Sequence, residues 1–156
     1  MIAVSILALG FACLYTTLGQ CLNVSRSHLE VLAATECLAQ RAEQARAAGW
    51  GSILTASAVR DQILSVPLAN ASALPNLQEQ ITITPYPAVT PAPTPIIVTR
   101  DISGLTSILS QPGISFDLRS IFAVRIDFSL TWQDHRSSRT HNRQQSTVVA
   151  LGGLLP

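Results

Sequence analysis

The chain has 156 residues, of which 47% are hydrophobic and only 12% charged, and its formal net charge is +1. Globular proteins usually carry about 25% charged residues, and here the ten basic residues, all arginine, are scattered singly. This pattern argues against a nucleic-acid-binding surface and against an acidic solvating tail. The length suffices for one domain of ordinary size plus an appended element.

The opening run, residues 1–25, contains no charged side chain and no proline. As a helix it would be about 37 Å long, and about 20 residues are enough to cross the hydrocarbon core of a bilayer. We therefore predict a membrane-spanning helix whose surface suits lipid or other apolar helices. The side chains expected to contact lipid or other helices are Ile2, Ile6, Leu7, Leu9, Leu14, Leu18 and Leu22.

A cleaved signal peptide is the alternative for this run, and it fits less well. No basic residue follows Met1, and the apolar run is longer than the 7–15 residues usual in a signal peptide. Lipoprotein processing needs small residues before a cysteine, but Phe11 precedes Cys13 closely and Gln20 directly precedes Cys21. If cleavage did occur, a soluble protein would begin near Ser25.

The following residues, 26–50, continue a helical pattern. There is no proline before Pro67, and Gly49 and Gly51 on either side of Trp50 supply a stop. The sequence thus predicts one helix of about 45–50 residues, and the alternative is two helices with a break near 23–27. The expected apolar stripe consists of Val31, Ala34, Thr35, Leu38, Ala42 and Ala45. The charged residues expected largely off the stripe are Arg26, Glu30, Glu36, Arg41, Glu43 and Arg46.

The segment after this helix begins as a connection. Residues 52–76 predict a linking region with a short helical turn at 59–64, and from Gln78 alternating residues predict a strand that ends at Pro85. Residues 85–95 contain five prolines, which favours an extended polyproline conformation. We prefer a stiff surface loop over a ligand for a proline-reading module.

The last third of the chain predicts antiparallel strands. Residues 96–102 form a candidate strand, 121–132 show the clearest alternation, 133–138 carry turn residues, and 139–151 can return as a hairpin partner. The apolar face of the clearest strand consists of Phe122, Val124, Ile126, Phe128, Leu130 and Trp132.

The predicted fold class is therefore α+β, with a long N-terminal helix packed on a small antiparallel sheet. The membrane half of the helix is assigned to 1–25, its amphipathic half to 26–50, and a β-rich head to 51–156. Val31, Leu38, Ala42 and Trp50 are expected to pack on the strand face named above.

The sequence offers few candidates for catalytic, metal-binding or disulfide-forming residues. Cys13, Cys21 and Cys37 are odd in number and confined to the first 40 residues, so a disulfide framework is not expected. The stretch DHRSSRTH at 134–141 could be imagined as a metal or acid–base site, but its spacing suits a solvated hairpin turn better. No phosphate loop, G-x-S-x-G, H-E-x-x-H or C-x-x-C is present. We expect no cofactor, no metal ligand and no catalytic residue.

Two stretches resemble a known family. MIAVSILALGFACLYTT followed by TECLAQRAEQARAAGW is similar to the N-terminal helix of type IV pilin-like proteins, especially minor, PilV-like pilins and type II secretion pseudopilins. FAVRIDFSLTWQDHRSSRTHNRQQSTVVALGGL resembles their usual ending. The resemblance covers residues 1–50 and 121–154, and 52–120 match nothing in the family.

Some family features are absent from the printed sequence. In the family, a prepilin peptidase cuts after a glycine, and the mature helix begins with a phenylalanine-like residue followed by a glutamate. Because members often run on into V-M-I-A, we expect Met1 to lie about six residues into the mature helix. The proline usual in mid-helix is also missing, with Thr16 near its place.

The resemblance implies a non-enzymatic structural subunit of a pilus or pseudopilus. It would be held in the bacterial inner membrane by one pass, with the head in the periplasm or exterior. The implied partners are other pilins or pseudopilins, membrane lipid, the prepilin peptidase and an assembly platform. No nucleic-acid partner is expected. An unrelated single-pass membrane protein with a periplasmic binding domain, and a secreted binding domain or enzyme, are the rival interpretations.

Overall fold

The computed structural model describes residues 2–91, 93–111, 121–134 and 139–152, with the backbone alone at Ile2, Val4 and Ser5. The chain divides into two compact units, Met1–Leu32 and Ala33–Pro156. The second unit contains the end of the long helix as well as the sheet, so the residues from Ala33 onward belong with the head.

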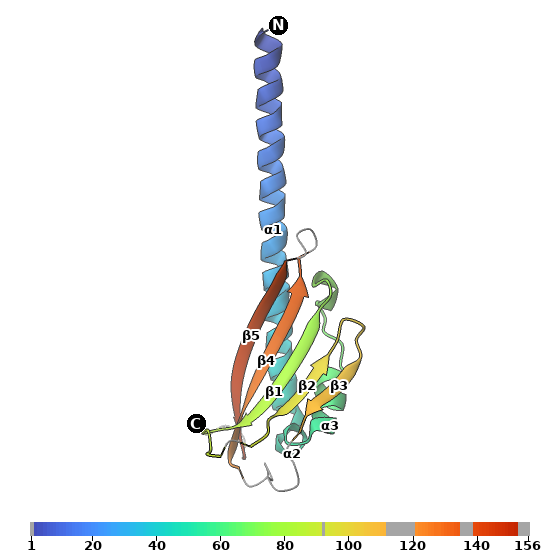
Figure 1. Ribbon diagram of the computed structural model, residues 1–156, viewed down its shortest axis with the longest axis vertical. Coiled ribbons are helices and arrows are strands. Elements are labelled where there is room, and N and C mark those ends of the chain that lie inside the picture. The colour runs from blue at the N-terminus through green and yellow to red at the C-terminus, as the bar shows by residue number, and fades with distance from the viewer. Residues whose placement is uncertain (1, 92, 112–120, 135–138, 153–156) are drawn as a thin grey trace. The chain divides into compact units, whose positions relative to one another are not determined.

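Helix α1 runs from Ile2 to Ala48 as one continuous helix, as predicted (Figure 1). No break occurs at 23–27, because nothing in that stretch interrupts the backbone hydrogen bonds of a helix. The helix ends where Gly49 adopts a φ of 77°, a left-handed conformation that glycine reaches without the steric cost of a Cβ.

Four short helical segments follow α1. They are α2 (Trp50–Ile53), α3 (Ala56–Ala58), the π-helical turn η1 (Val59–Leu64) and the 3₁₀ turn η2 (Ala71–Ala73). The sequence predicted the turn at 59–64 but no helix at the other three places. Their apolar residues point into the head, where Ile53, Ala56, Val59, Ile63 and Leu64 are buried.

The sheet has five strands in the order β3-β2-β1-β4-β5, and every neighbouring pair is antiparallel (Figure 1). The strands are β1 (Gln78–Pro85), β2 (Ile96–Arg100), β3 (Thr106–Ser110), β4 (Ala123–Gln133) and β5 (Thr140–Ala150). In the centre, Ile81 of β1 lies opposite Val98 of β2 and Phe128 of β4. Four of these strands agree with the sequence prediction, whereas β3 was not anticipated.

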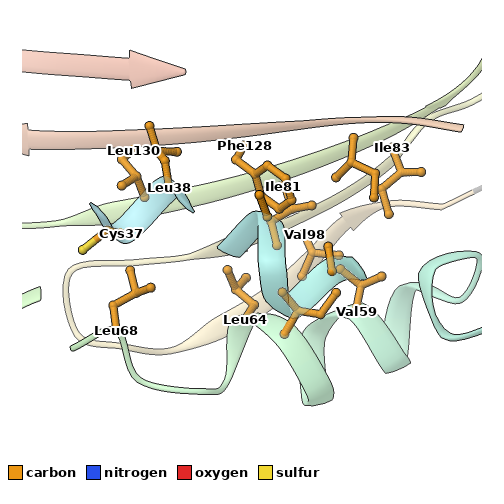
Figure 2. Packing of buried hydrophobic residues seen from close by; sticks show 14 of the residues in the cluster. Cys37, Leu38, Val59, Leu64, Leu68, Ile81, Ile83, Val98, Phe128 and Leu130 are labelled. Atoms are coloured by element: carbon orange, nitrogen blue, oxygen red, sulfur yellow. The ribbon is translucent and has the colours of Figure 1, made fainter. Parts of the chain in front are cut away.

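One face of the sheet builds the core together with the end of α1 and η1. Figure 2 shows Leu38 of α1 and Val59 and Leu64 of η1 among the side chains of the sheet, including Ile81 and Phe128. The buried residues of α1 are Ala33, Ala34, Cys37, Leu38, Arg41, Ala42 and Ala45. Small residues dominate this list, and they allow the helix backbone to approach the sheet closely.

The expected packing residues do not all reach the core. Val124, Ile126, Phe128, Leu130 and Trp132 are buried, but Phe122 is 79% exposed because β4 begins one residue after it. The expectation for Phe122 is therefore wrong. Of the helix stripe, Thr35 is exposed and Val31 is half-buried in the first unit. Trp50 is half-buried and packs against the core.

The proline-rich segment after β1 is a loop, but it is not continuously extended as predicted. It bends at Tyr86–Pro87 and again at Thr90–Pro91, and both of these peptide bonds are cis. The residues 135–138 of the candidate turn DHRSSRTH lie outside the described part of the chain.

Candidate functional site

The most distinctive surface is the apolar surface around α1 in the first unit. The large apolar side chains there that are at least 60% exposed include Ile6, Leu7, Leu9, Phe11, Leu14, Leu18 and Leu22. A water-soluble helix normally hides such residues on one face, whereas these surround the helix. Within the described residues, α1 is the one helix long and apolar enough to cross a membrane.

Three hydroxyl side chains on this part of α1 form hydrogen bonds within the helix. Thr16 Oγ1 donates to the carbonyl of Ala12 at 2.7 Å, Thr17 Oγ1 to Cys13 at 2.8 Å, and Ser25 Oγ to Cys21 at 2.9 Å. A hydroxyl bonded to the carbonyl one turn earlier does not need water. These residues are therefore compatible with an apolar surrounding.

A buried arginine ties the head end of α1 to the sheet. Arg41 is 1% exposed, and its Nε and Nη2 donate to Glu79 Oε2 and Oε1 of β1 at 2.8 and 3.1 Å. Its Nη1 donates to Gln44 Oε1 at 2.7 Å and to the carbonyl of Ile63, and its Nη2 reaches the carbonyl of Leu64 at 3.4 Å. These contacts occupy all five N–H donors of a guanidinium group.

The hydrogen-bond acceptors around Arg41 explain why this charged side chain can be buried. Ile63 and Leu64 end the π-helical turn η1, and carbonyls at the end of a helical segment lack partners within it. Glu79, itself 4% exposed, also accepts from Arg100 Nη1 of β2 at 3.2 Å. The expectation that Arg41 lies off the buried stripe is therefore wrong. Glu79 neutralises its charge, and Glu79 and the η1 carbonyls accept its hydrogen bonds, so the side chain can be buried.

The opposite face of the sheet is polar and hydrogen-bonded. Arg125 Nε donates to Asp127 Oδ1 at 2.8 Å, and Asn142 Nδ2 donates to Ser129 Oγ at 3.0 Å and to Thr131 Oγ1 at 2.9 Å. The first pair lies within β4, whereas the bonds of Asn142 link β5 to β4, and together they order the polar side chains of this face. This face suits contact with water.

Among the open depressions in the described part of the head, two differ in character. One, of about 270 Å³, is polar and is lined by residues such as Gln80, Thr99 and Arg100. The other, of about 360 Å³, is apolar and lies between the proline-rich loop and β4, with Tyr86 and Val89 in its wall. Neither holds an arrangement of nucleophile and base that would indicate catalysis.

The remaining reactive side chains lie apart from one another. Cys13 and Cys21 are exposed on the apolar helix, whereas Cys37 is buried in the head. Burial raises the pKa of the Cys37 thiol, which therefore stays protonated at neutral pH. His141 stacks on Trp132 with ring centroids 5.5 Å apart. In the described parts of the chain, no group of three or more His, Cys, Asp or Glu side chains is placed to hold a metal ion.

The residues that the sequence analysis assigned to sites thus form two separate groups in the structure. The side chains assigned to the membrane half lie on the exposed surface of the first unit, except that of Ile2, which is not described. Most of those assigned to packing lie in the head core. Sequence reasoning missed Glu79 and Arg100, although Glu79 occupies an inward position of its alternating strand and was detectable there.

No family model matches this chain, and neither a curated protein nor a solved structure shows a significant match to it. The structure itself establishes an α+β fold in which the end of a long N-terminal helix packs on an antiparallel sheet, an arrangement compatible with a pilin-like fold. It also establishes one helix apolar enough to be a candidate membrane span.

Proposed function

We propose that this chain is a structural subunit, a minor pilin or pseudopilin, of a type IV pilus-like or type II secretion filament. The observation that carries the proposal is α1 itself. Its first unit exposes apolar residues such as Leu7, Leu14 and Leu18, and its continuation from Ala33 to Ala48 is part of the head core. A helix with these two parts can anchor a folded head and also assemble with other helices.

The physical basis of this proposal is that a lipid bilayer and a bundle of apolar helices are both apolar environments. The apolar side chains of residues 6–22 can contact lipid tails, and they can equally contact other apolar helices. Moving the helix from a bilayer into a helix bundle therefore exposes no apolar surface to water. Such an exchange is what a filament subunit needs when it leaves the membrane.

The proposed location follows from the same helix. The subunit is held in the bacterial inner membrane by one pass, and its head lies in the periplasm until assembly. Its partners are other pilin or pseudopilin subunits, with membrane lipid before assembly and a prepilin peptidase and assembly platform acting on it. The head acts in recognition and not in catalysis.

The proposal is tested by following the chain in cells that make the filament. Membranes are extracted with alkaline carbonate, sheared filaments are collected separately, and both are probed for the chain. We expect the wild type to resist carbonate extraction and to be present in the filament fraction. The N-terminus of the isolated protein, determined by Edman degradation, distinguishes the prepilin processing that the proposal implies from cleavage near Ser25.

Different results would favour other functions. Resistance to carbonate without any chain in the filament fraction would indicate an unrelated single-pass protein with a periplasmic binding domain. A soluble protein beginning near Ser25 would indicate a cleaved signal. Phe122→Ala is a suitable control, because Phe122 lies on the head, is 79% exposed and should leave both fractions unchanged.

A further inference from the structure

The two edges of the sheet differ in how well they are protected against pairing with another strand. Strand β3 forms one edge and β5 the other (Figure 1). β3 is five residues long, and its register with β2 shifts between Ile97 and Val98. Short length and irregular pairing keep an edge strand from accepting a new partner. β5 is eleven residues long and pairs with β4 without a register shift, so it is the edge that is open to an added strand.

The sequence of β5, THNRQQSTVVA, contains little that would block such pairing. It has no proline, no glycine, no lysine and no acidic residue. Edge strands that must stay unpaired commonly carry lysine, proline or a bulge. Threonine and valine, which both recur in β5, favour the extended backbone of a strand. β5 therefore stays extended although, in the described part of the chain, no strand pairs with its outer edge.

The hydrogen bonds to β4 show which backbone groups of β5 point outward. Leu151 N donates to the carbonyl of Phe122 at 2.7 Å, which makes these opposing residues a hydrogen-bonded pair. Hydrogen-bonded and non-hydrogen-bonded pairs alternate along an antiparallel ladder. The odd-numbered residues of β5 consequently bond to β4, and the even-numbered residues direct their N–H and C=O groups away from the sheet. These residues are Thr140, Asn142, Gln144, Ser146, Val148 and Ala150. A row of alternating donors and acceptors is matched by the backbone of another extended peptide.

Arg143 gives this edge a charge preference. It is the one charged residue of β5 at neutral pH, it is exposed, and within the described residues no carboxylate pairs with it. With an added strand, Arg143 would belong to a non-hydrogen-bonded pair, in which opposing side chains come closest. A carboxylate on that strand would then form a stabilising cross-strand pair with it. A second copy of β5 has no carboxylate to offer, so the charge favours a strand from another protein over self-pairing.

We propose that the outer edge of β5 binds an extended, acidic peptide segment of a partner protein, antiparallel to β5 and with a carboxylate opposite Arg143. An antiparallel strand continues the pairing of the whole sheet. Backbone hydrogen bonds to the even-numbered residues supply affinity, and Arg143 supplies specificity. The inference goes beyond the proposed function and does not rest on it, because it uses residues of the head alone.

The test uses the full chain in mild detergent and a fluorescent synthetic peptide as long as β5, in which threonine and serine alternate around a central glutamate. One control peptide carries glutamine in place of the glutamate. A second control is N-methylated on alternate residues along the edge that would face β5, which removes its backbone donors. Fluorescence polarisation gives the affinities, and hydrogen exchange measured by mass spectrometry locates the bound peptide.

Two variants of the chain separate charge from backbone pairing. Arg143→Gln removes the charge at an exposed position. Gln144→Pro removes an outward N–H but no hydrogen bond to β4, a place where an edge strand tolerates proline. Gln144→Ala is its matched control, and circular dichroism checks that each head is folded. If Gln144→Pro unfolded the head, the Arg143→Gln comparison would still decide the outcome.

We expect the glutamate peptide to bind several-fold more tightly than the glutamine peptide, and Arg143→Gln to remove this difference. The N-methylated peptide should not bind, and Gln144→Pro should lose binding that Gln144→Ala retains. Bound peptide should slow hydrogen exchange in β5 and not in β3. No binding of the glutamate peptide, equal affinity for both peptides, or protection of β3 in place of β5 would overturn the proposal. Failure of the proposed function would show separately, as a chain that is absent from the filament fraction.

Discussion

Arg41 of α1 and Glu79 of β1 form a bidentate ion pair, with side chains only 1% and 3% exposed. The pair lies 38 residues apart in sequence and joins the end of the long helix to the central strand of the sheet. Because the helix surface around it consists mostly of alanine, this pair supplies a directional contact that apolar packing alone does not.

Removing one partner of this pair should destabilise the head strongly. Arg41→Met leaves the Glu79 carboxylate buried with Arg100 alone and leaves the carbonyls of Ile63 and Leu64 without their donor. Breaking a buried pair in this way costs about 3–5 kcal/mol. The free energy of unfolding, measured by urea titration in mild detergent, should fall by that amount.

A double-mutant cycle separates this pair from general packing effects. Arg41→Met with Glu79→Met should be less destabilising than the sum of the two single changes, since neither charge is then left without the other. Arg60→Met is the control, because Arg60 pairs with Asp61 at the surface and solvent-exposed pairs of this kind contribute little to stability. Strict additivity in the cycle would contradict the coupling.

Two phenylalanines test the register of β4. Phe128 is 1% exposed and Phe122 is 79% exposed. Phe128→Ala should lower the free energy of unfolding by about 3–5 kcal/mol, as large-to-small changes in a core do. Phe122→Ala should change it by no more than about 0.5 kcal/mol, which is usual for a surface position. If Phe128→Ala destabilised the head no more than Phe122→Ala does, the face of β4 that carries Phe128 would not be buried.

Leu14→Arg tests the membrane helix. Leu14 is 60% exposed in the first unit, and an arginine near the centre of a spanning helix costs about 2.5–3.5 kcal/mol on insertion scales. We expect less chain in the carbonate-resistant membrane fraction. Leu105→Arg, at a head position that is 68% exposed, should leave that fraction unchanged. Equal retention of both variants would argue against the membrane span.

The buried thiol of Cys37 gives a pH dependence with a definite sign. Burial raises the pKa of Cys37 above its ordinary value of 9.0, with Glu79 adding to the effect, while a hydrogen bond from Asn70 opposes it. The unfolded chain therefore loses this proton at lower pH than the folded chain, and stability falls as pH rises above about 9. This loss, measured by urea titration at several pH values, should be smaller in Cys37→Ala.

The same thiol should react slowly with alkylating agents. In detergent at pH 8, iodoacetamide should modify Cys37 much more slowly in the folded chain than after denaturation, because the folded head covers this thiol. Mass spectrometry of the peptide that contains Cys37 reports both rates. Rapid labelling of Cys37 in the folded chain would mean that the end of α1 is not packed in the head.

Much of the fold could be predicted because its signals are local. The absence of proline and the stop at Gly49 predict α1, and alternating residues predict β1 and β4. Strand β3 was missed because its five residues, TSILS, alternate weakly and none of them is fully buried. Phe122 was misassigned because alternation continues one residue beyond the last strand pairing.

The polar contacts of the candidate site could not be predicted in the same way. A charged residue such as Arg41 falls among the polar positions of any helical pattern, and its burial depends on Glu79 and on two carbonyls that are distant in sequence. Periodicity carries no information about such partners. The apolar surface of residues 6–22, in contrast, could be predicted from composition alone, because the polar side chains in that stretch are few and uncharged.

In the described residues, every buried side chain belongs to Ala33 or to a later position. A genetic crossover near residue 32 would therefore join a new head to the old apolar helix without dividing either set of contacts. Heads of different shape can in this way be joined to one inherited helix. The contacts that fold the head are thus separable from the exposed apolar surface of residues 6–22.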